Sequence, residues 1–135
     1  MKILNIELNI NSLEKNQLID ITMEIKQKVI DSHIENGMVQ IFVPHTTAAV
    51  TVNENTDQDV RHDLLKGLNS VFPNRQDYRH YESNSDAHLK SSVIGNHQTI
   101  FIEENQLKLG QWQAIFFCEF DGPRNRHVYL QLMGD

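Results

Sequence analysis

The stretch FVPHTTAAVTVNENTDQDVRHDLL, residues 42–65, changes its hydrophobic period halfway along its length. It begins as an apolar run that stops at Pro44. A proline cannot donate a hydrogen bond to a sheet, which predicts that a strand ends there. A second short strand follows at residues 48–52, and from Val60 onward the apolar residues recur at helical spacing. The stretch therefore predicts a strand, a second strand and a helix, with polar residues gathered at the two junctions.

The composition is that of a single globular domain covering residues 1–135, with 39% hydrophobic and 22% charged residues. The net charge of −6 argues against a nucleic-acid binder, which needs a basic face to displace counterions. Cys118 is the only cysteine, so no intrachain disulfide forms. Neither a signal-peptide run nor an apolar run of membrane-spanning length is present. We therefore expect a cytoplasmic protein that binds neither nucleic acid nor membrane.

Strand patterns predominate along the rest of the chain. Strands are predicted at residues 4–10, 37–44, 48–52, 112–120 and 127–133, and a hairpin is predicted to turn near residues 104–105. One helix is predicted at residues 21–36, stopped by Gly37, and a second from Val60 to about Phe72. Residues 73–90 lack a clean period and form either a functional loop or a flexible excursion. Six or seven strands with two helices predict an α+β fold, an antiparallel or mixed sandwich with its helices on one side.

Polar residues gather where the second strand meets the helix. Asn53 and Glu54 lie between the strand and the helix, and Thr56 with Asp59 resembles a capping box. Such residues are favoured in turns and near helix N-termini, so local turn chemistry explains them. A helix N-terminus also suits an anion, and carboxylates suit Mg²⁺ held against a phosphate, so a binding site is the alternative explanation. His45, at the end of the first strand, is either a base, a metal ligand or a polar cap.

Two further motifs carry chemistry. In DAHLK, the residues Asp86, His88 and Lys90 alternate and would share one face of an extended segment. They form either a phosphate or metal site or an ordinary exposed strand. In CEFDGPR, Glu119 ends a very apolar strand and lies either on its outer face or buried with a partner. Arg124 is a candidate for that partner, and alternatively for binding phosphate in a bidentate fork.

Three motifs, HTTAAVTVNEN, AHLKSS and LGQWQAIFFCEFDGPRNR, together with the order of the elements, resemble the YjbQ family. Its members are described as secondary thiamine-phosphate synthase enzymes. The resemblance covers nearly the whole chain and implies a two-sheet, jelly-roll-like β-sandwich with mostly antiparallel strands and two main helices. It also implies a homotrimer with pockets near the subunit contacts. The implied activity joins hydroxymethylpyrimidine diphosphate to thiazole phosphate, giving thiamine phosphate and pyrophosphate, so the implied partner is a small phosphorylated metabolite.

The resemblance also implies roles for individual residues. The catalytic residues it implies are His45, His88, Glu119 and Arg124. The substrate-binding residues it implies are Asn53, Lys90 and Arg124. The metal ligands it implies are Glu54, Asp59, Asp86 and His88. The family pattern places a second histidine two residues before His88, where this chain has Asp86, so the hard cation Mg²⁺ is favoured over Zn²⁺ as the divalent metal.

Three functions fit these residues. The first is the synthase, in which Lys90 and Arg124 bind phosphate oxygens while His45 or His88 orients or protonates the leaving group. The second is a metal-dependent hydrolase of small phosphorylated or ester substrates. The third is a non-catalytic trimeric protein that binds a phosphorylated metabolite.

Overall fold

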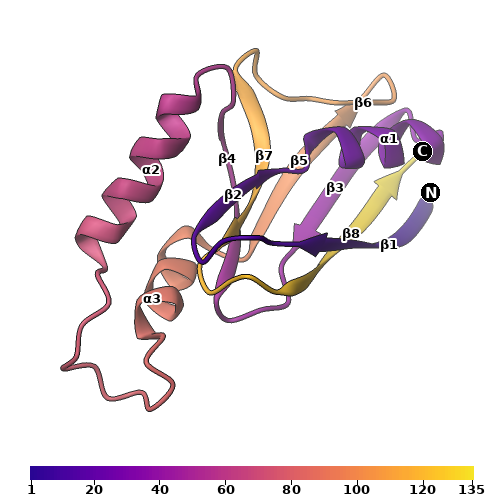
Figure 1. Cartoon of the computed structure of the whole chain (residues 1–135). Helices are drawn as coiled ribbons and strands as arrows, with labels where there is room; N and C mark the ends of the chain where they lie inside the picture. Colours follow the sequence, from indigo (N-terminus) through magenta and orange to yellow (C-terminus); the bar gives the residue numbers. More distant parts are fainter.

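The computed structural model describes all residues, Met1–Asp135, as two antiparallel sheets that face each other with three helices (Figure 1). The larger sheet has the strand order β1-β8-β3-β5-β6 and consists of β1 (Lys2–Asn11), β8 (Asn125–Gly134), β3 (Asn36–Phe42), β5 (His97–Glu103) and β6 (Gln106–Leu107). The smaller sheet has the order β2-β7-β4 and consists of β2 (Gln17–Asp20), β7 (Gln113–Glu119) and β4 (Ala48–Glu54). The fold is therefore α+β, as predicted.

Strand β7 is buried on both faces, which explains its nearly unbroken apolar sequence. Because side chains alternate along a strand, Ile115 and Phe117 point into the core between the two sheets. Phe116 and Cys118 point the other way, into a second cluster on the outer face of the smaller sheet. The strand thus contributes side chains to both hydrophobic cores, and its alternation determines which core each residue faces.

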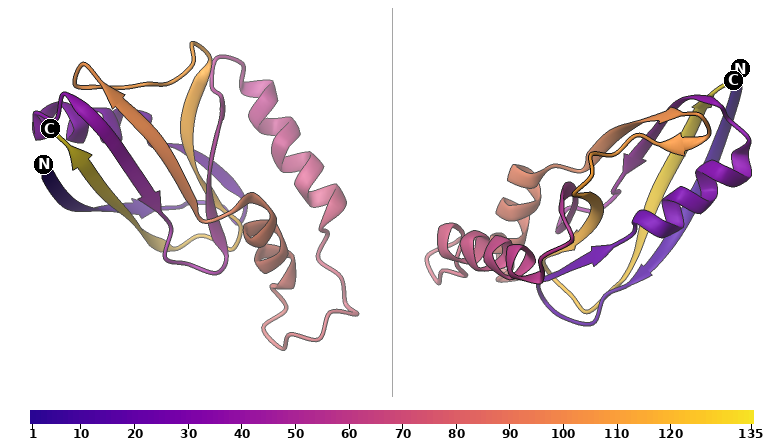
Figure 2. Two further views of the ribbon diagram at one scale, coloured as in Figure 1. Left: turned by 180° about the vertical axis from the view of Figure 1, so that it is seen from behind. Right: turned by 90° about the horizontal axis from the view of Figure 1, so that it is seen from above.

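The three helices fill different spaces (Figure 2). Helix α1 (Thr22–Ser32) buries Ile25 and Val29 in the core between the sheets. Helices α2 (Gln58–Val71) and α3 (Ser85–Ile94) lie over the outer face of the smaller sheet. The expectation that all helices share one side is therefore wrong. None of the three is both long enough and apolar enough to cross a membrane.

Helix α3 is the main departure from the predicted elements, because it occupies part of the segment that showed no period. Its buried residues are Asp86, Ala87, Lys90 and Ser91, so a polar rather than an apolar stripe faces the protein. A helix whose buried face is polar leaves no hydrophobic repeat to detect. The prediction of two main helices was one too few for this reason.

Element boundaries differ at two other places. Helix α1 ends at Ser32 rather than residue 36, because His33 adopts a left-handed conformation with φ of 57°. Gly37 does not stop the helix but lies in β3, where an added Cβ would sit 1.9 Å from the Met133 carbonyl oxygen. Strand β2 was not among the predicted strands. The hairpin turn near residues 104–105 is confirmed, with φ near 60° at both positions.

Replacing Phe117 by Ala tests the central position of β7. We expect the free energy of unfolding to fall by about 3–5 kcal/mol, because the large ring is fully buried in the core between the sheets. Phe101→Ala is the matched control, since Phe101 is 62% exposed and its loss should cost less than about 1 kcal/mol. Urea denaturation measures both. Equal losses in the two variants would contradict the described core.

Candidate functional site

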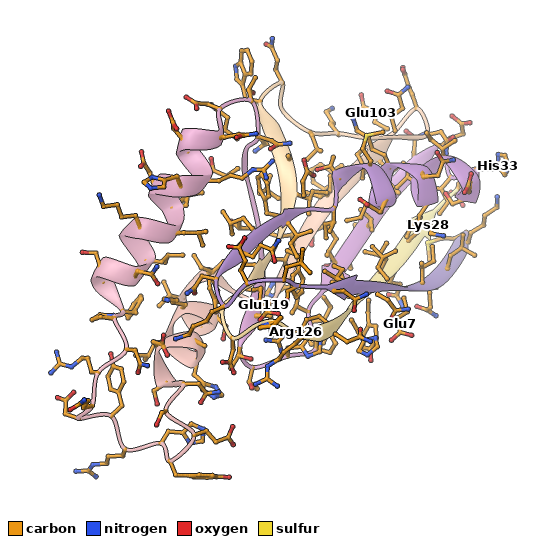
Figure 3. The ribbon with its side chains drawn as sticks, in the orientation of Figure 1. Glu7, Lys28, His33, Glu103, Glu119 and Arg126 are labelled. Atoms are coloured by element: carbon orange, nitrogen blue, oxygen red, sulfur yellow. The ribbon has the colours of Figure 1, made fainter.

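A buried ion pair closes one end of the core between the sheets. Glu119 is the last residue of β7 and continues the inward-facing series that contains Phe117, while Arg126 is the inward-facing residue near the start of β8. The guanidinium of Arg126 donates from Nη2 to Glu119 Oε2 at 2.5 Å and from Nε to Oε1 at 2.9 Å. Figure 3 shows the two residues side by side at the edge of the sandwich. The pair therefore joins the end of the smaller sheet to the larger one.

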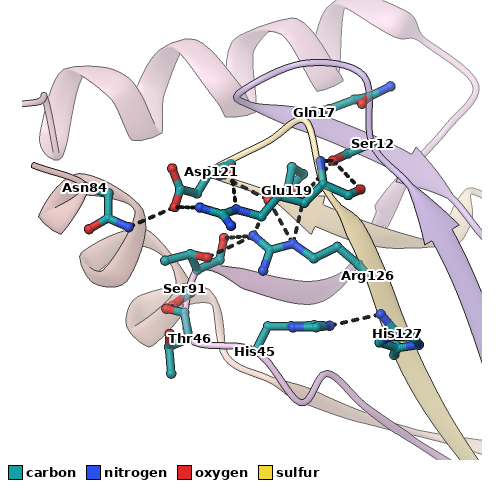
Figure 4. Close-up of polar contacts among 12 residues, drawn as sticks. Ser12, Gln17, His45, Thr46, Asn84, Ser91, Glu119, Asp121, Arg126 and His127 are labelled. Atoms are coloured by element: carbon teal, nitrogen blue, oxygen red, sulfur yellow. Dashed lines mark hydrogen bonds and ion pairs between the residues drawn. The ribbon is translucent and has the colours of Figure 1, made fainter. Parts of the chain in front are cut away.

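The carboxylate of Glu119 has several further partners (Figure 4). The Ser12 hydroxyl donates to Oε1 at 2.6 Å, and the Asp121 backbone N–H donates to Oε2 at 3.1 Å. Burial by itself would raise the pKa of Glu119, but these hydrogen bonds and the Arg126 charge outweigh it and lower the pKa. Glu119 is thus an ionised anchor that connects to the neighbouring pocket through Arg126 and Asp121.

A pocket of about 650 Å³ opens next to this pair. It brings together three of the predicted site residues from distant parts of the chain: His45 follows β3, His88 lies on α3, and Arg124 lies in the turn between β7 and β8. The other polar side chains that line it are Thr46, Thr47, His80, Glu82, Asn84, Asn96, Asp121 and Arg126. The lining thus holds two arginines and three histidines together with the carboxylates of Glu82 and Asp121.

The His45 imidazole is held in its neutral form. Its Nε2 accepts a hydrogen bond from the backbone N–H of His127 at 2.9 Å, so the ring hydrogen is on Nδ1. Burial lowers the pKa of His45, and the nearby positive charge of Arg126 lowers it further. The ring of His127 stacks on that of His45 with centroids 6.1 Å apart. His45 can therefore offer one N–H to a ligand at neutral pH.

Arg124 is positioned by a short chain of hydrogen bonds. Its Nε donates to the Asp121 carbonyl at 2.7 Å and its Nη2 to Asp121 Oδ2 at 3.0 Å. The same Oδ2 accepts from Asn84 Nδ2 at 2.8 Å, as Figure 4 shows. The turn between them requires Gly122, whose added Cβ would lie 2.2 Å from the Glu14 carbonyl oxygen. The expected alternative, in which Arg124 pairs with Glu119, is wrong because Arg126 takes that place.

Asn84 gives up a local interaction to hold Asp121. It occupies the N-cap position of α3, where an asparagine side chain usually accepts a backbone hydrogen bond, but here no such bond forms. Its Oδ1 is buried without a partner. The side-chain amide is instead directed at Asp121, so Asn84 serves the pocket at the expense of the helix end.

Asp86 and Lys90 lie away from the pocket, although they come from the same motif as His88. In a helix, residues four apart share a face and the residue midway between them points elsewhere, so the expected extended arrangement of the three is wrong. Lys90 Nζ donates to Asn69 Oδ1 at 2.5 Å, and burial lowers its pKa. Asp86 Oδ2 lies 3.0 Å from the Lys15 ammonium group. This buried network ties α3 to α2 and to the loop before β2.

Asn53, Glu54 and Asp59 lie at the other end of the smaller sheet. Ala48, at the start of β4, pairs with Glu119, whereas Glu54 is six residues further along, a distance of roughly 20 Å for an extended strand. Asn53 Oδ1 accepts the Glu54 N–H, and Asp57 caps α2 by accepting the Asp59 N–H, so the cap is not Thr56. These are the contacts of turn chemistry.

The four predicted metal ligands do not fit one ion in this chain. Glu54 and Asp59 lie at the far end of the smaller sheet, Asp86 is paired with Lys15, and His88 alone lines the pocket. Nowhere do three His, Cys, Asp or Glu side chains converge in a way that could hold a metal.

Residues outside the predicted set of site residues complete the pocket. Arg126 is the most important, and its position opposite the inward-facing Glu119 follows from strand alternation once β7 and β8 are known to face each other. Asn84 and Glu82 come from the segment that lacked a period, so nothing in their spacing singled them out. His80, from the same segment, contacts His88 edge to face with centroids 5.3 Å apart.

Comparison with known proteins identifies relatives along nearly the full chain. The family described as UPF0047 protein YjbQ-like matches residues 6–135. A UPF0047 protein of Methanocaldococcus jannaschii is 45% identical over 93% of this chain and 91% of its own, and the YugU protein of Bacillus subtilis is 44% identical over 94% and 97%. The chain belongs to the YjbQ/UPF0047 family.

Solved structures agree with this assignment. A YjbQ/UPF0047 family protein from Clostridium acetobutylicum has a TM-score of 0.93 and 48% identity, covering 95% of this chain and 99% of its own. A YbjQ-like protein of unknown function from Sulfolobus solfataricus has a TM-score of 0.95 and 31% identity, covering 99% of both chains. The fold is therefore shared at both levels of sequence identity.

Replacing Glu119 by Gln tests the buried pair. We expect a loss of about 3–5 kcal/mol in unfolding free energy, because the Arg126 charge remains buried without a counterion. The matched control is Glu103→Gln, which removes an exposed pair with Lys108 and should cost less than about 1 kcal/mol.

The stability that Glu119 contributes should depend on pH. Because the pKa of Glu119 is lowered in the folded state, its contribution to the free energy of unfolding is present above pH 4.5 and is lost as pH falls through the folded pKa. The stability gap between wild type and Glu119→Gln should therefore shrink in acid; a gap that stays constant would contradict this.

Replacing Asn84 by Ser tests the chain that positions Arg124. Serine is a good N-cap, so stability should stay within about 1 kcal/mol of wild type while the bond to Asp121 is lost. The Nε–H signal of Arg124 in an NMR spectrum should then exchange faster with water. Arg75, which pairs with Asp77, is the internal control and should not change. An unchanged Arg124 signal would show that Asn84 does not position it.

Proposed function

We propose that this member of the YjbQ/UPF0047 family binds a small phosphorylated metabolite in the pocket and catalyses departure of a phosphate-type leaving group. The specific reaction we propose is of the thiamine-phosphate synthase type, joining hydroxymethylpyrimidine diphosphate to thiazole phosphate. One observation carries the proposal. Arg124, Arg126 and the neutral His45 converge with His88 on a single pocket, although they come from three separate segments of the chain.

Phosphate binding is the first requirement, and the arginines suit it. The side chain of Arg124 is 52% exposed, and its Nη1 has no partner within the protein. Arg126 uses Nε and Nη2 for Glu119 and Thr47, so its own Nη1 is also without a protein partner beside the pocket. Guanidinium groups bind phosphate oxygens through such paired donors. The two free Nη1 groups can therefore donate to the oxygens of a phosphate or diphosphate group.

The proposed chemistry needs charge stabilisation more than proton transfer. The thiazole nitrogen uses its lone pair to form a bond to the methylene carbon, the bond from that carbon to the diphosphate oxygen breaks, and its electron pair leaves with pyrophosphate. Negative charge therefore grows on the leaving oxygen, where Arg124, Arg126 and the Nδ1–H of His45 can donate. A volume of about 650 Å³ is within the usual range of ligand pockets.

The two rival functions gain less support. A metal-dependent hydrolase needs a ligand set, and the predicted ligands do not converge, so we derive no step through a metal. A non-catalytic binding protein would use the same arginine contacts, and turnover alone separates it from the synthase. The divalent cation, the homotrimer and the cytoplasmic location stay predictions.

Replacing Arg124 by Ala should weaken the binding of pyrophosphate at least tenfold, which corresponds to about 1.4 kcal/mol. The reason is the loss of the exposed guanidinium on the pocket wall. Arg75→Ala is the matched control, because Arg75 is also an exposed arginine paired with a nearby aspartate but lies outside the pocket. Isothermal titration calorimetry measures both variants.

Turnover of the two thiamine precursors is assayed on the same preparations. Binding without any product would favour the non-catalytic protein. Absence of pyrophosphate binding by the wild type, or equal loss in both arginine variants, would contradict the proposed function.

A further inference from the structure

A second hollow adjoins the pocket on the outer face of the larger sheet. It has a volume of about 550 Å³ and is lined by Asn5, Ile6, Glu7, Gln40, Phe42, Tyr129, Leu130 and Gln131. Phe42 lines both hollows, because it is the last residue of β3 and the chain continues from it to Pro44 and His45 in the first pocket. The two spaces therefore meet at one aromatic side chain.

The floor of this second hollow is aromatic. Phe42 and Tyr129 are directly opposite each other in the β3–β8 pairing, and their side chains are 44% and 45% exposed. Both point away from the core, since their neighbours Ile41 and Leu130 point into it. Two opposed, half-exposed rings form a surface on which a flat aromatic group can pack, and such contacts are worth about 0.5–1.5 kcal/mol beyond area burial.

The polar groups around the rings are neutral amides. They are Asn5, Gln40 and Gln131, and the Gln131 amide donates to Asn5 Oδ1 at 2.9 Å. Amides offer both donors and acceptors, which suits the ring nitrogens and exocyclic groups of a heterocycle. The one carboxylate, Glu7, lies 3.1 Å from the His127 ring. No cationic side chain lines the hollow, so it does not compete with the arginine pocket for the phosphate.

His127 links the two hollows from the other side. Its ring stacks on His45, which belongs to the phosphate pocket, and approaches Glu7, which belongs to the second hollow. The boundary between them is thus formed by Phe42 and the His45–His127 stack. A ligand that occupies both hollows would carry a ring joined to a phosphate.

We propose that the Phe42–Tyr129 hollow is a binding subsite for a flat aromatic or heteroaromatic ring of the same ligand whose phosphate lies at Arg124. This inference rests on the proposed function and adds the place where the ring of the ligand would bind. The Phe42 and Tyr129 rings select the ring, and the amides orient it.

The test compares phenyl phosphate with inorganic phosphate by isothermal titration calorimetry. The wild type should bind phenyl phosphate at least fivefold more tightly, because only that probe has a ring. Phe42→Ala and Tyr129→Ala should both remove this advantage. Tyr129 lines only the second hollow, so Tyr129→Ala should also leave the affinity for inorganic phosphate unchanged. Phe101→Ala is the matched control, because Phe101 is an exposed phenylalanine of the same sheet that lines neither hollow, and the advantage should persist in it.

The NMR signals of the Tyr129 ring report ring contact separately during the phenyl phosphate titration. If inorganic phosphate does not bind but phenyl phosphate shifts these signals, the proposed function fails and the subsite is supported. If phosphate binds while phenyl phosphate binds no tighter and leaves the signals unchanged, the subsite is overturned and the proposed function stands. Light scattering compares the molecular mass of Phe42→Ala with that of the wild type. A lower mass for the variant would also overturn the subsite, since the outer face of the larger sheet would then be a contact between copies of the chain.

Discussion

The structure depends on one buried ion pair, Glu119 with Arg126. Both residues occupy inward-facing positions that would otherwise be apolar, so the end of the core consists of a charge pair with every carboxylate oxygen bonded. Desolvating two charges is costly, and such a pair is tolerated only when further hydrogen bonds satisfy it. Here Ser12, Thr47 and the Asp121 backbone supply them. The pair thereby holds together the three loops that carry Ser12, Thr47 and Asp121.

The pocket follows from those fixed loops. Thr47 belongs to the segment that carries His45, and Asp121 begins the turn that carries Arg124, so the buried pair determines where the exposed groups stand. Arg126 acts on both sides, since it neutralises Glu119 and its charge helps to keep His45 neutral. Asn84 then connects α3 to the same turn. The pocket residues are therefore held in place by the buried hydrogen bonds around Glu119 and Arg126.

Much of the fold was accessible from the sequence because most elements bury an apolar face. The periods around β1, α2 and β7 predicted those elements, and the motifs of the family resemblance predicted that His45, His88 and Arg124 act together. Helix α3 escaped detection because Asp86 and Lys90 form its buried face, and polar pairs leave no hydrophobic repeat. The polar residues at 53–59 lie outside the pocket. Their sequence could not separate turn chemistry from anion binding, since capping a helix and binding an anion require the same residue types.

A crystal structure of the protein with pyrophosphate would show whether the anion binds in the pocket beside the Glu119–Arg126 pair. We expect the anion in the pocket beside the buried pair, within hydrogen-bonding distance of Arg124 and of the free nitrogen of Arg126, with Glu119 still bonded to Arg126. An anion bound instead at the start of α2, near Asn53 and Glu54, would contradict it. So would a pocket in which Glu119 leaves Arg126 to contact the ligand.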